Sequence, residues 1–558
     1  MTAYTPIKDI VPSKNDFWFL PLGGSNEIGM NLNLFGYNNQ WLIVDLGITF
    51  HDRNGVDVIA PDPSFLIQHR DKIGGIVLTH AHEDHIGAIP YLWPYLRCPI
   101  YATPFTMRIL RQKLAEKSWK NDVPLIEIPL CGTFNVGDFK VEYITLTHSI
   151  LEPNALRIET PHGVILHTGD WKIDPNPMIG EATDIKRLKE IGDEGVLAMI
   201  CDSTNVFNNG EAGSEKDVHD EMAKLMATFP DNRLTVACFA SNVARLETVA
   251  KIAASLGRQV ALVGRSMHRM VSAAKDSGYL KELPQFISDT DAMKLPDSKV
   301  CFITTGSQGE ARAALARIAG DQHPVVKYTE NDVVLFSSRM IPGNEKNISA
   351  VQNRLVHKGI RIVTSSEEDI HVSGHPARDE LRQMYEWVRP EVLIPVHGEA
   401  RHLDEHARFA LECGVETAVI PENGSIIQLK KGDTCEIDYI QTGRWVYDGN
   451  RMIDMKSNVL KDRQKLSTDG LVAATLIIDA SNQLLQAPDL TLIGLCDSPE
   501  EKSVLEREIY LAVQDSLTRG YRSDDDRIEA VKAIIRKATN RYLDKKPVVT
   551  VHIIVAEI

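Results

Sequence analysis

Three histidines and two acidic residues fall within six consecutive positions of the sequence, His80-Ala81-His82-Glu83-Asp84-His85. The apolar run Gly75–Leu78 precedes them and predicts a β-strand, and strand alternation places His80 and His82 on one face. Asp84 and His85 begin a predicted helix that points back at the same spot. Imidazole and carboxylate ligands suit zinc, manganese or iron. Because a catalytic metal keeps one coordination position open, the ligands exceed the needs of one ion, and we expect two.

Two metals need further ligands from distant segments, and three residues that end predicted strands are candidates. His148 ends VEYITLTH, Asp170 ends VILHTGD and His397 ends VLIPVHG, each with a turn or small residue after it. Sites are commonly built at such ends of rigid elements. A solvated histidine loop is the alternative interpretation of H-x-H-x-D-H. We interpret six other histidines as core or surface residues: His51, His69, His162, His219, His323 and His552.

Composition indicates a globular protein of several domains. The chain has 558 residues, of which 43% are hydrophobic and 25% charged, and this excludes disorder for most of its length. No apolar run reaches the ~20 residues of a spanning helix, and the N-terminus lacks the pattern of a signal peptide. The eight cysteines are scattered without a CxxC pair, as in a reducing cytosol. We therefore expect a cytoplasmic protein without a membrane association.

The net charge of −15 argues against a protein that coats DNA or RNA along its whole surface. It does not exclude an enzyme that acts on nucleic acids, because such an enzyme can confine its basic residues to one channel. Bound divalent metals would also add positive charge that the sequence count omits.

The pattern of predicted elements changes along the chain. Short strands with Gly, Asn and Asp turns dominate residues 1–214 and return over 369–445. Between them, over 215–368, four apolar runs each end in a small-residue turn and open a helix, which is typical of a parallel α/β layer. We interpret 446–470 as a linker because it is polar and weakly periodic. Residues 471–558 read as a small α+β domain with three strands and two helices.

The order of HAHEDH, TH, HTGDW and PVHGE resembles the metallo-β-lactamase superfamily of dinuclear hydrolases. The resemblance implies an α/β fold class, an αββα sandwich with an inserted domain. It also implies that His80, His82 and His148 bind one metal and that Asp84, His85 and His397 bind the other. Asp170 would bridge the two metals.

The insertion between Asp202 and His371 resembles the β-CASP subgroup, whose members cut nucleic acids. Asp202 in CDSTN, His371 in HVSGH and His397 in PVHGE match its three motifs. LGGSNEIGMN, FASN and TGSQGE, together with the C-terminal α+β domain, are similar to the ribonuclease J family. One departure is FHDRNGVD at residues 50–57, where members of that family often carry an acidic stretch. The resemblance therefore does not extend to an accessory metal there.

This resemblance implies a metal-dependent ribonuclease with 5′→3′ exonuclease and endonuclease activity in RNA maturation and decay. Two Zn²⁺ ions per chain are expected, with Mn²⁺ or Mg²⁺ as alternatives, and they would activate water for attack on phosphorus. Asp84 would act in catalysis through its metal. We hypothesise that His371 donates a proton to the leaving oxygen, or a hydrogen bond to the phosphoryl group, and that Asp202 orients a metal-binding histidine.

Strand-to-helix turns are candidate substrate contacts, because a helix start behind small residues binds anions. Two such turns are expected to hold a nucleotide phosphate: Phe239, Ala240 and Ser241, and His371, Val372, Ser373, Gly374 and His375. Nearby arginines would contact the RNA backbone, namely Arg245, Arg265, Arg312 and Arg339. The expected partners are single-stranded RNA with a 5′-monophosphate end and further copies of the chain, as a homodimer or homotetramer.

Two other functions are compatible with parts of the sequence. A small-molecule hydrolase of the thioesterase type would use the same metals, but it would not need an inserted domain over the cleft. A scaffold subunit of an RNA-processing complex that has lost catalysis would not keep a complete ligand set. Bound metal separates these alternatives, since the scaffold would hold none.

Overall fold

The computed structural model describes residues 10–53, 56–519 and 521–556. The chain divides into two compact units, one with the residues up to Thr49 and Ile59–Arg444, the other with Phe50–Val58 and Trp445–Ile558. Part of the N-terminal stretch that we interpret as lacking a signal peptide, residues 1–9, lies outside the described residues, as do residues 54–55 of the segment 50–57. None of the helices in the described part of the chain is both long and apolar enough to cross a membrane.

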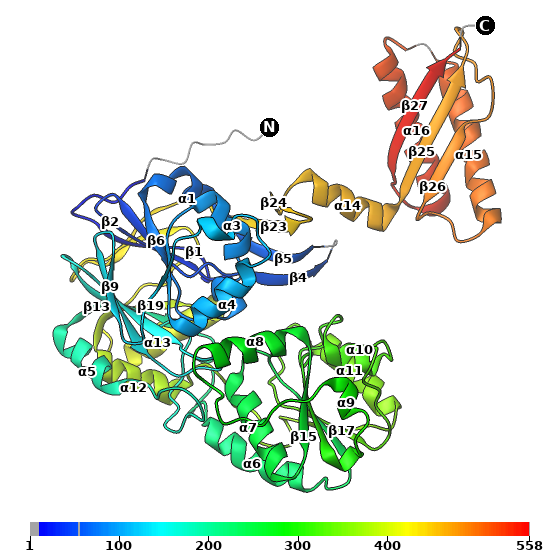
Figure 1. Cartoon of the computed structure of the whole chain (residues 1–558). Helices are drawn as coiled ribbons and strands as arrows, with labels where there is room; N and C mark the ends of the chain where they lie inside the picture. The colour runs from blue at the N-terminus through cyan, green and yellow to red at the C-terminus, as the bar shows by residue number, and fades with distance from the viewer. Residues whose placement is uncertain (1–9, 54–55, 520, 557–558) are drawn as a thin grey trace. The chain divides into compact units, whose positions relative to one another are not determined.

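Two large sheets form the centre of the first unit (Figure 1). The first sheet has, in spatial order, β22 (Cys435–Tyr439), β21 (Ser425–Gln428), β1 (Phe17–Gly23), β2 (Leu32–Tyr37), β3 (Gln40–Val44), β6 (Ile73–Val77), β7 (Ile100–Ala102) and β8 (Leu125–Glu127). The second has β20 (Thr417–Ala418), β19 (Pro390–Val396), β13 (Val196–Asp202), β12 (Gly163–His167), β11 (Asn154–Thr160), β10 (Phe139–Thr145) and β9 (Thr133–Val136).

The inner faces of the two sheets share one apolar core, in which Phe19 and Phe35 of the first sheet meet Tyr143 and Ile200 of the second. Helices cover the outer faces. On the first sheet these are α1 (Ser64–Gln68), α3 (Ile89–Leu96) and α4 (Pro104–Leu114), and on the second α5 (Ile185–Glu194), α12 (Arg378–Val388) and α13 (Ala400–Glu412). Strands covered on both faces read as continuous apolar runs, as β13 does. The expected αββα sandwich is confirmed.

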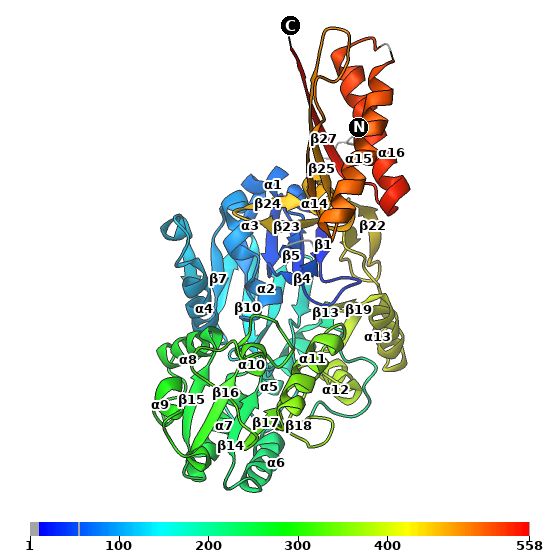
Figure 2. The same ribbon diagram turned by 90° about the vertical axis from the view of Figure 1, so that its right-hand side faces the viewer.

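The inserted domain is a five-stranded parallel sheet, drawn in green in Figure 2. Its strands, in spatial order, are β15 (Gln259–Val263), β16 (Val300–Thr304), β14 (Arg233–Ala237), β17 (Asp332–Phe336) and β18 (Arg361–Thr364). Its helices are α6 (Glu215–Ala227), α7 (Val243–Ser255), α8 (Arg265–Asp276), α9 (Asp289–Ala292), α10 (Ala314–Ala319) and α11 (Glu345–His357). Every described pairing in this sheet is parallel, which confirms the predicted α/β layer.

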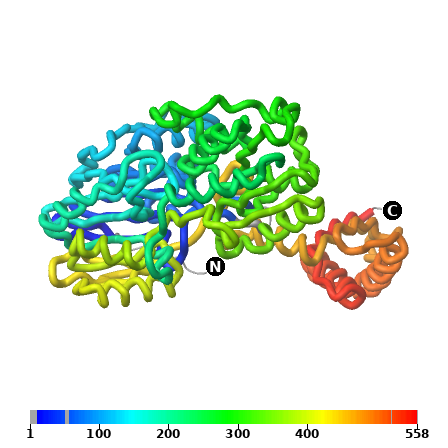
Figure 3. Tube along the Cα trace, turned by 90° about the horizontal axis from the view of Figure 1, so that it is seen from below, coloured from blue at the N-terminus to red at the C-terminus, as the bar shows by residue number. Residues whose placement is uncertain are grey.

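After the inserted domain the chain returns to the second sheet. β19 pairs in parallel with β13 from Val196 to Asp202, although the two strands lie almost two hundred residues apart in the sequence. Figure 3 shows this returning part, in yellow, beside the cyan segments of the first part. The return places residues that follow the insertion, His397 among them, at the same sheet edge as residues that precede it.

The second unit contains the small C-terminal domain and the segment before it. β25 (Leu471–Ile478) pairs with β26 (Asp489–Ile493) and β27 (Val548–Val555), and α15 (Pro499–Leu517) and α16 (Asp524–Leu543) pack on this sheet. The predicted α+β domain is confirmed. The predicted linker is more ordered than we expected, because it contains β24 (Arg451–Asp454), which pairs with β23 (Arg444–Asp448), and α14 (Asn458–Asp469). Only Leu460 of α14 is buried, which explains its weak periodicity.

β23 and β24 belong to a four-stranded sheet with β4 (Thr49–Arg53) and β5 (Val56–Pro61).

Candidate metal centre

The motif that carries three histidines lies where β6 of the first sheet ends. His80 and His82 occupy the turn after the strand, and His85 lies in the short helix α2 (Glu83–Ile86). Asp84 lies in the first turn of α2, where a carboxylate is favoured by the partial positive charge of the helix N-terminus. The strand and helix therefore bring all four side chains to one end of the sandwich.

The second sheet supplies three further residues at the same end. His148 follows β10, Asp170 follows β12, and His397 follows β19 with a left-handed φ of 54°. All three are less than a tenth exposed. The left-handed turn at His397 ends the strand abruptly and turns the imidazole back toward the first sheet, where Asp84 lies.

Three imidazoles form the first group of candidate ligands. Nδ1 of His82 lies 3.1 Å from Nε2 of His80 and 3.1 Å from Nε2 of His148. Two nitrogens bound tetrahedrally to one zinc ion, each at about 2.05 Å, would lie about 3.3 Å apart. When three ring nitrogens face one another at this spacing, hydrogen bonds between the rings cannot pair all three of them. The donor set and its spacing fit a metal ion.

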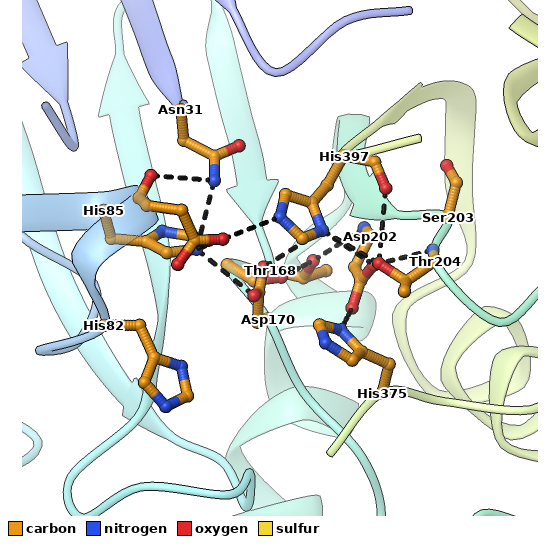
Figure 4. A network of polar contacts seen from close by, with 12 residues as sticks. Asn31, His82, His85, Thr168, Asp170, Asp202, Ser203, Thr204, His375 and His397 are labelled. Carbon is orange, nitrogen blue, oxygen red and sulfur yellow. Dashed lines mark hydrogen bonds and ion pairs between the residues drawn. The ribbon is translucent and has the colours of Figure 1, made fainter. Parts of the chain in front are cut away.

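The second group consists of Asp84, His85, Asp170 and His397 (Figure 4). A third group, Asp170, Asp202, His375 and His397, shares two of these residues. Oδ2 of Asp170 lies 3.2 Å from Nε2 of His85, and Oδ2 of Asp84 lies 3.2 Å from Nε2 of His397. Oδ2 of Asp170 also lies 4.0 Å from Nε2 of His80 and 3.9 Å from Nε2 of His148. One carboxylate thus stands between two sets of donors.

The electrostatics of the centre favour the protonation states that bind metals. Burial lowers the pKa of His80 and of His148 well below the usual value, and neighbouring imidazoles lower both further. Burial also lowers the pKa of His82, to about 4. Burial opposes ionisation of Asp170, but His397 and His85 hold the pKa of this carboxyl well below its usual range. The three imidazoles of the first group therefore suit a divalent cation, which binds neutral rings. Burial opposes protonation of His85 and His397, but Asp170 and the neighbouring carboxylates raise the pKa of both well above the usual value, so a metal would displace a proton from each.

Sequence analysis missed two residues that hold His85 in place. Asp45 follows β3, is fully buried and accepts a hydrogen bond of 2.7 Å from Nδ1 of His85. It also accepts hydrogen bonds of 2.8 Å from the backbone N and the Oγ1 of Thr79. The side chain of Asn31 lies 3.1 Å from Nε2 of the same histidine. An acidic residue at the end of an apolar strand was the only signal for Asp45, and the signal for Asn31 was its place at the end of the motif LGGSNEIGMN.

Asp202 joins the metal-binding region to the segment that follows the insertion. Its Oδ2 accepts a hydrogen bond of 2.7 Å from Nδ1 of His375, and its Oδ1 accepts one of 2.6 Å from Oγ1 of Thr204. Oγ1 of Thr204 lies 2.8 Å from Nδ1 of His397 (Figure 4). A carboxylate in this position can orient His397 and raise the basicity of its ring.

His371, for which we hypothesise a role in the chemical step, lies in the segment that follows the insertion. No hydrogen bond joins its ring to the metal-binding residues or to Asp202 in the described parts of the chain, and its Nδ1 is buried without a partner. Burial lowers the pKa of His371, and the charges of Arg245, Lys172 and Arg339 lower it further, to about 3. A neutral ring keeps one N–H, which suits the alternative role that we hypothesise, a hydrogen bond to the phosphoryl group. His375, four residues later, contacts Asp202 instead.

Among the other expected substrate contacts, Ser241 and Gly374 lie against candidate metal ligands, whereas Arg245 lies in the interior of the inserted domain. Oγ of Ser241 lies 3.1 Å from Nε2 of His82, and Phe239 and Ala240 are half-buried beside it. Gly374 accepts a hydrogen bond from His148 through its carbonyl oxygen, and a Cβ at Gly374 would lie 2.7 Å from that ring. The expectation that Arg245 contacts RNA is wrong, because its side chain is fully buried.

A cavity of about 800 Å³ opens beside the loop 371–376. Its lining includes Asn205, Ser338, Arg339, His371 and Ser373. Oγ of Ser373 accepts hydrogen bonds from Nδ2 of Asn205 at 2.7 Å and from the backbone N of His375 at 3.2 Å. Its own proton has no acceptor among the described residues. A hydroxyl, an imidazole and a guanidinium that face one cavity can bind an anion.

Four domain families match parts of the chain. They are the Beta-lactamase superfamily domain over residues 41–187 and the Ribonuclease J, beta-CASP domain over 231–355. The Zn-dependent metallo-hydrolase RNA specificity domain matches 359–421, and the Ribonuclease J C-terminal domain matches 458–556. The first three together include all the candidate metal ligands and most of the residues that surround them.

Whole-length relatives show the same pattern. The chain is 44% identical to ribonuclease J of Sinorhizobium meliloti over 96% of both chains. It is 37% identical to ribonuclease J of Mycolicibacterium smegmatis over 95% of both chains. It is 33% identical to ribonuclease J of Helicobacter pylori over 97% of this chain and 80% of that one.

A solved structure, a protein of unknown function from Enterococcus faecalis, superposes with a TM-score of 0.53 at 18% identity. It covers 74% of this chain and 100% of its own, and it supports the fold alone.

Proposed function

The chain belongs to the ribonuclease J family, and on this premise we propose that its centre holds two zinc ions and acts on the 5′-monophosphate end of RNA. The protein is a metal-dependent ribonuclease, a hydrolase of phosphodiester bonds whose substrate is RNA. A thioesterase-type hydrolase and a non-catalytic scaffold are not favoured, because the whole-length relatives are ribonucleases and the insertion matches their β-CASP domain.

The observation that carries this proposal is the position of Asp170, which belongs to the second group of donors and lies 4.0 Å from His80 and 3.9 Å from His148 of the first. His80, His82 and His148 would hold one metal, and Asp84, His85 and His397 the other. Bound divalent metals supply Lewis-acid activation of water and neutralise charge on the phosphoryl oxygens. The zinc-dependent domain family that matches residues 359–421 supports zinc over manganese or magnesium.

We assign proton donation to the leaving 3′-oxygen to His375. The pKa of His375 is lowered by burial, but the neighbouring carboxylate of Asp202 outweighs burial and raises it above the usual value. The Asp202 hydrogen bond to Nδ1 leaves Nε2 of His375 as the atom that can deliver a proton.

The cavity beside the loop 371–376 is the proposed pocket for a terminal phosphate. Ser373, whose hydroxyl proton has no acceptor among the described residues, lines it together with His371 and Arg339. Ser241 would contact the same end of the RNA from the other turn, next to His82.

The protein is proposed to act as a 5′→3′ exonuclease and an endonuclease in RNA maturation and decay in the cytoplasm, as a homodimer or homotetramer. The C-terminal domain supports the assembly. Its sheet face opposite α15 and α16 carries exposed apolar side chains, among them Ile493 and Ile554, which are 57% and 52% exposed. Such a face is typical of an association surface.

The proposed substrate preference is tested on one RNA prepared with a 5′-hydroxyl, a 5′-monophosphate or a 5′-triphosphate and labelled at its 3′ end. We expect the 5′-monophosphate form to be degraded fastest, with mononucleotide release from the 5′ end. Equal rates on the three forms would contradict the proposed pocket for a terminal phosphate. Absence of all hydrolysis while the metals are bound would contradict the proposed activity.

A further inference from the structure

Five charged side chains are buried behind the loop 371–376 and take no part in the metal centre. Lys172, Asp174, Glu215, Arg245 and Glu380 are each at most 4% exposed. Burying a charge is costly unless it is paired and hydrogen-bonded. Their hydrogen bonds connect the segment after Asp170 with the start of the inserted domain, and they connect both of these with the two ends of the loop.

Arg245 holds the N-terminal end of the loop. Its Nη2 lies 2.9 Å from Oε2 of Glu215, at the start of α6. Its Nη1 donates a hydrogen bond of 2.8 Å to the carbonyl oxygen of Ile370, the residue before His371. The same Nη1 contacts Oγ of Ser337, which itself donates a hydrogen bond of 2.7 Å to Ile370. The guanidinium thus joins the α6 terminus to the loop.

Lys172 and Asp174 join that helix terminus to the metal-binding segment. Lys172 lies two residues after Asp170, and its Nζ is 3.2 Å from Oδ2 of Asp174. The same oxygen of Asp174 accepts a hydrogen bond of 2.9 Å from the backbone N of Glu215, and its Oδ1 accepts one of 2.7 Å from Ser214. The chain of contacts therefore runs from Asp170 to Arg245 without reaching solvent.

Glu380 holds the C-terminal end of the loop. Its Oε2 accepts hydrogen bonds from the backbone N of Ala377 at 2.7 Å and of Ala212 at 2.9 Å. Its Oε1 accepts one of 2.8 Å from the backbone N of Ile173. One carboxylate therefore fixes the end of the loop, the segment that enters the inserted domain, and the segment after Asp170.

The loop between these two anchors carries the groups that meet the metals and the substrate. His375 contacts Asp202, and the carbonyl oxygen of Gly374 accepts a hydrogen bond from His148. Val372 packs against Gly213, where a Cβ would lie 2.9 Å from it and where φ is +88°. Lys172 donates a hydrogen bond of 3.0 Å to the carbonyl oxygen of Gly213. A shift of either anchor would move these contacts together.

We propose that Arg245 and Glu380 are positioning residues, which hold both ends of the loop 371–376 at a fixed distance from the metal centre. The role in catalysis rests on the function proposed above, whereas the anchoring of the loop does not. Arg245 acts through Ile370, and Glu380 acts through Ala377. Neither touches substrate or metal, and their effect on the reaction is carried by His375, Ser373 and His371.

The first test is Arg245→Lys, with Arg233→Lys as the matched control. Lysine keeps a charge opposite Glu215 but lacks the planar fork that reaches Ile370 and Ser337 together. Arg233 is also buried in the inserted domain, and its Nε lies 2.6 Å from Oδ1 of Asp332. It is the first residue of β14, and the loop lies at the other end of that strand. Both changes disturb a buried ion pair, and only one disturbs the loop.

With zinc saturating, kcat is measured per folded, metal-loaded chain. We expect Arg245→Lys to lower it by about 10²-fold, the cost of a misplaced group, and Arg233→Lys to leave it unchanged. We also expect Arg245→Lys to lower the ratio of kcat/KM for 5′-monophosphate RNA over 5′-hydroxyl RNA by about tenfold or more. If Arg245 had only a structural role, Arg245→Lys would reduce the folded fraction alone. The kcat and the ratio of kcat/KM for the two RNAs would then equal those of Arg233→Lys, and this result would overturn the proposal.

The second test does not depend on activity and remains decisive if Arg245→Lys does not fold. Glu380→Gln has one acceptor oxygen where three backbone N–H groups need acceptors, so at least one hydrogen bond to a loop anchor is lost. Glu405→Gln is the control, since Glu405 is buried and bonded to the side chain of Arg378 but not to the loop. Amide hydrogen exchange of the whole chain is followed at residues 371–377.

We expect faster exchange at 371–377 in Glu380→Gln and wild-type protection in Glu405→Gln. Unchanged protection in Glu380→Gln would overturn the anchoring. If the wild-type protein shows no end preference or no hydrolysis, the proposed function fails, and the exchange measurement still decides whether the loop is anchored as proposed.

Discussion

Nδ1 of His375 lies 2.7 Å from Oδ2 of Asp202, and the ring of His375 stacks on that of His397 with their centroids 5.6 Å apart. This contact joins the last residue of β13 in the second sheet to the loop that follows the insertion. It places one imidazole beside the candidate metal ligands, and His375 forms a further group of possible ligands with Asp170, Asp202 and His397.

From this relationship we predict that His375→Ala lowers kcat for RNA hydrolysis by about 10²–10⁴-fold, the range for loss of a positioned acid or base. His371→Ala should leave the hydrolysis of circular RNA, which has no end, close to wild type. Metal content should be unchanged in both variants, since the seven candidate ligands remain. A larger loss on circular RNA for His371→Ala than for His375→Ala would return the chemical role to His371.

The comparison of these two histidines shows what a sequence can and cannot indicate. The ligands in His80–His85 are predictable because their spacing is short and one strand end carries them. Asp45 has no such spacing, and its contact with His85 exists only because β3 and β6 are neighbours. His371 and His375 share one short motif, and only the packing of the loop shows which of them faces Asp202.

The fold could be predicted for a similar reason. Parallel strands of the insertion read as apolar runs with helices after them, and the structure confirms them. The burial of Arg245 could not be predicted, because an arginine at a strand-to-helix turn looks the same in the sequence whether its partner is RNA or Glu215. The order of the segment 446–470 was missed because α14 buries a single leucine, which leaves no periodic pattern.

Ser373→Ala should affect RNA ends selectively. It removes a hydroxyl donor that lines the proposed phosphate pocket, at a cost of about 1.5–3 kcal/mol for a hydrogen bond to a charged group. That cost corresponds to about 10–150-fold lower exonuclease activity on 5′-monophosphate RNA. The measurement compares one linear RNA with its circular form. An equal loss on both would place Ser373 in the general active site.

The pKa of His371 gives a prediction about pH. Because burial and nearby cations lower this pKa to about 3, the ring is neutral in the free enzyme at every pH above about 4. An ordinary histidine would instead gain its charge as the pH falls through about 6.5. We therefore expect kcat/KM for 5′-monophosphate RNA to show parallel pH profiles in wild type and His371→Asn between about pH 5 and 8. An acid limb near pH 6.5 that is lost in His371→Asn would contradict this assignment.

Removal of the C-terminal domain should change assembly and leave the metals in place. A chain that ends at Ser457 keeps β23 and β24 and loses α14 and the domain with the exposed face at Ile493 and Ile554. We expect a smaller particle in sedimentation at unchanged metal content per chain. If the shortened chain keeps the oligomeric state of the full chain, the domain is not the assembly surface.

The most direct test of the dinuclear centre is zinc content measured together with RNA hydrolysis in wild type, Asp170→Asn and Asp332→Asn. Asp332 is a buried carboxylate paired with Arg233, far along the chain from any ligand, and serves as the control. We predict about two zinc ions per chain and full activity in wild type and in Asp332→Asn. Asp170→Asn should hold less metal and hydrolyse no RNA. Full metal content with wild-type hydrolysis in Asp170→Asn would contradict the account.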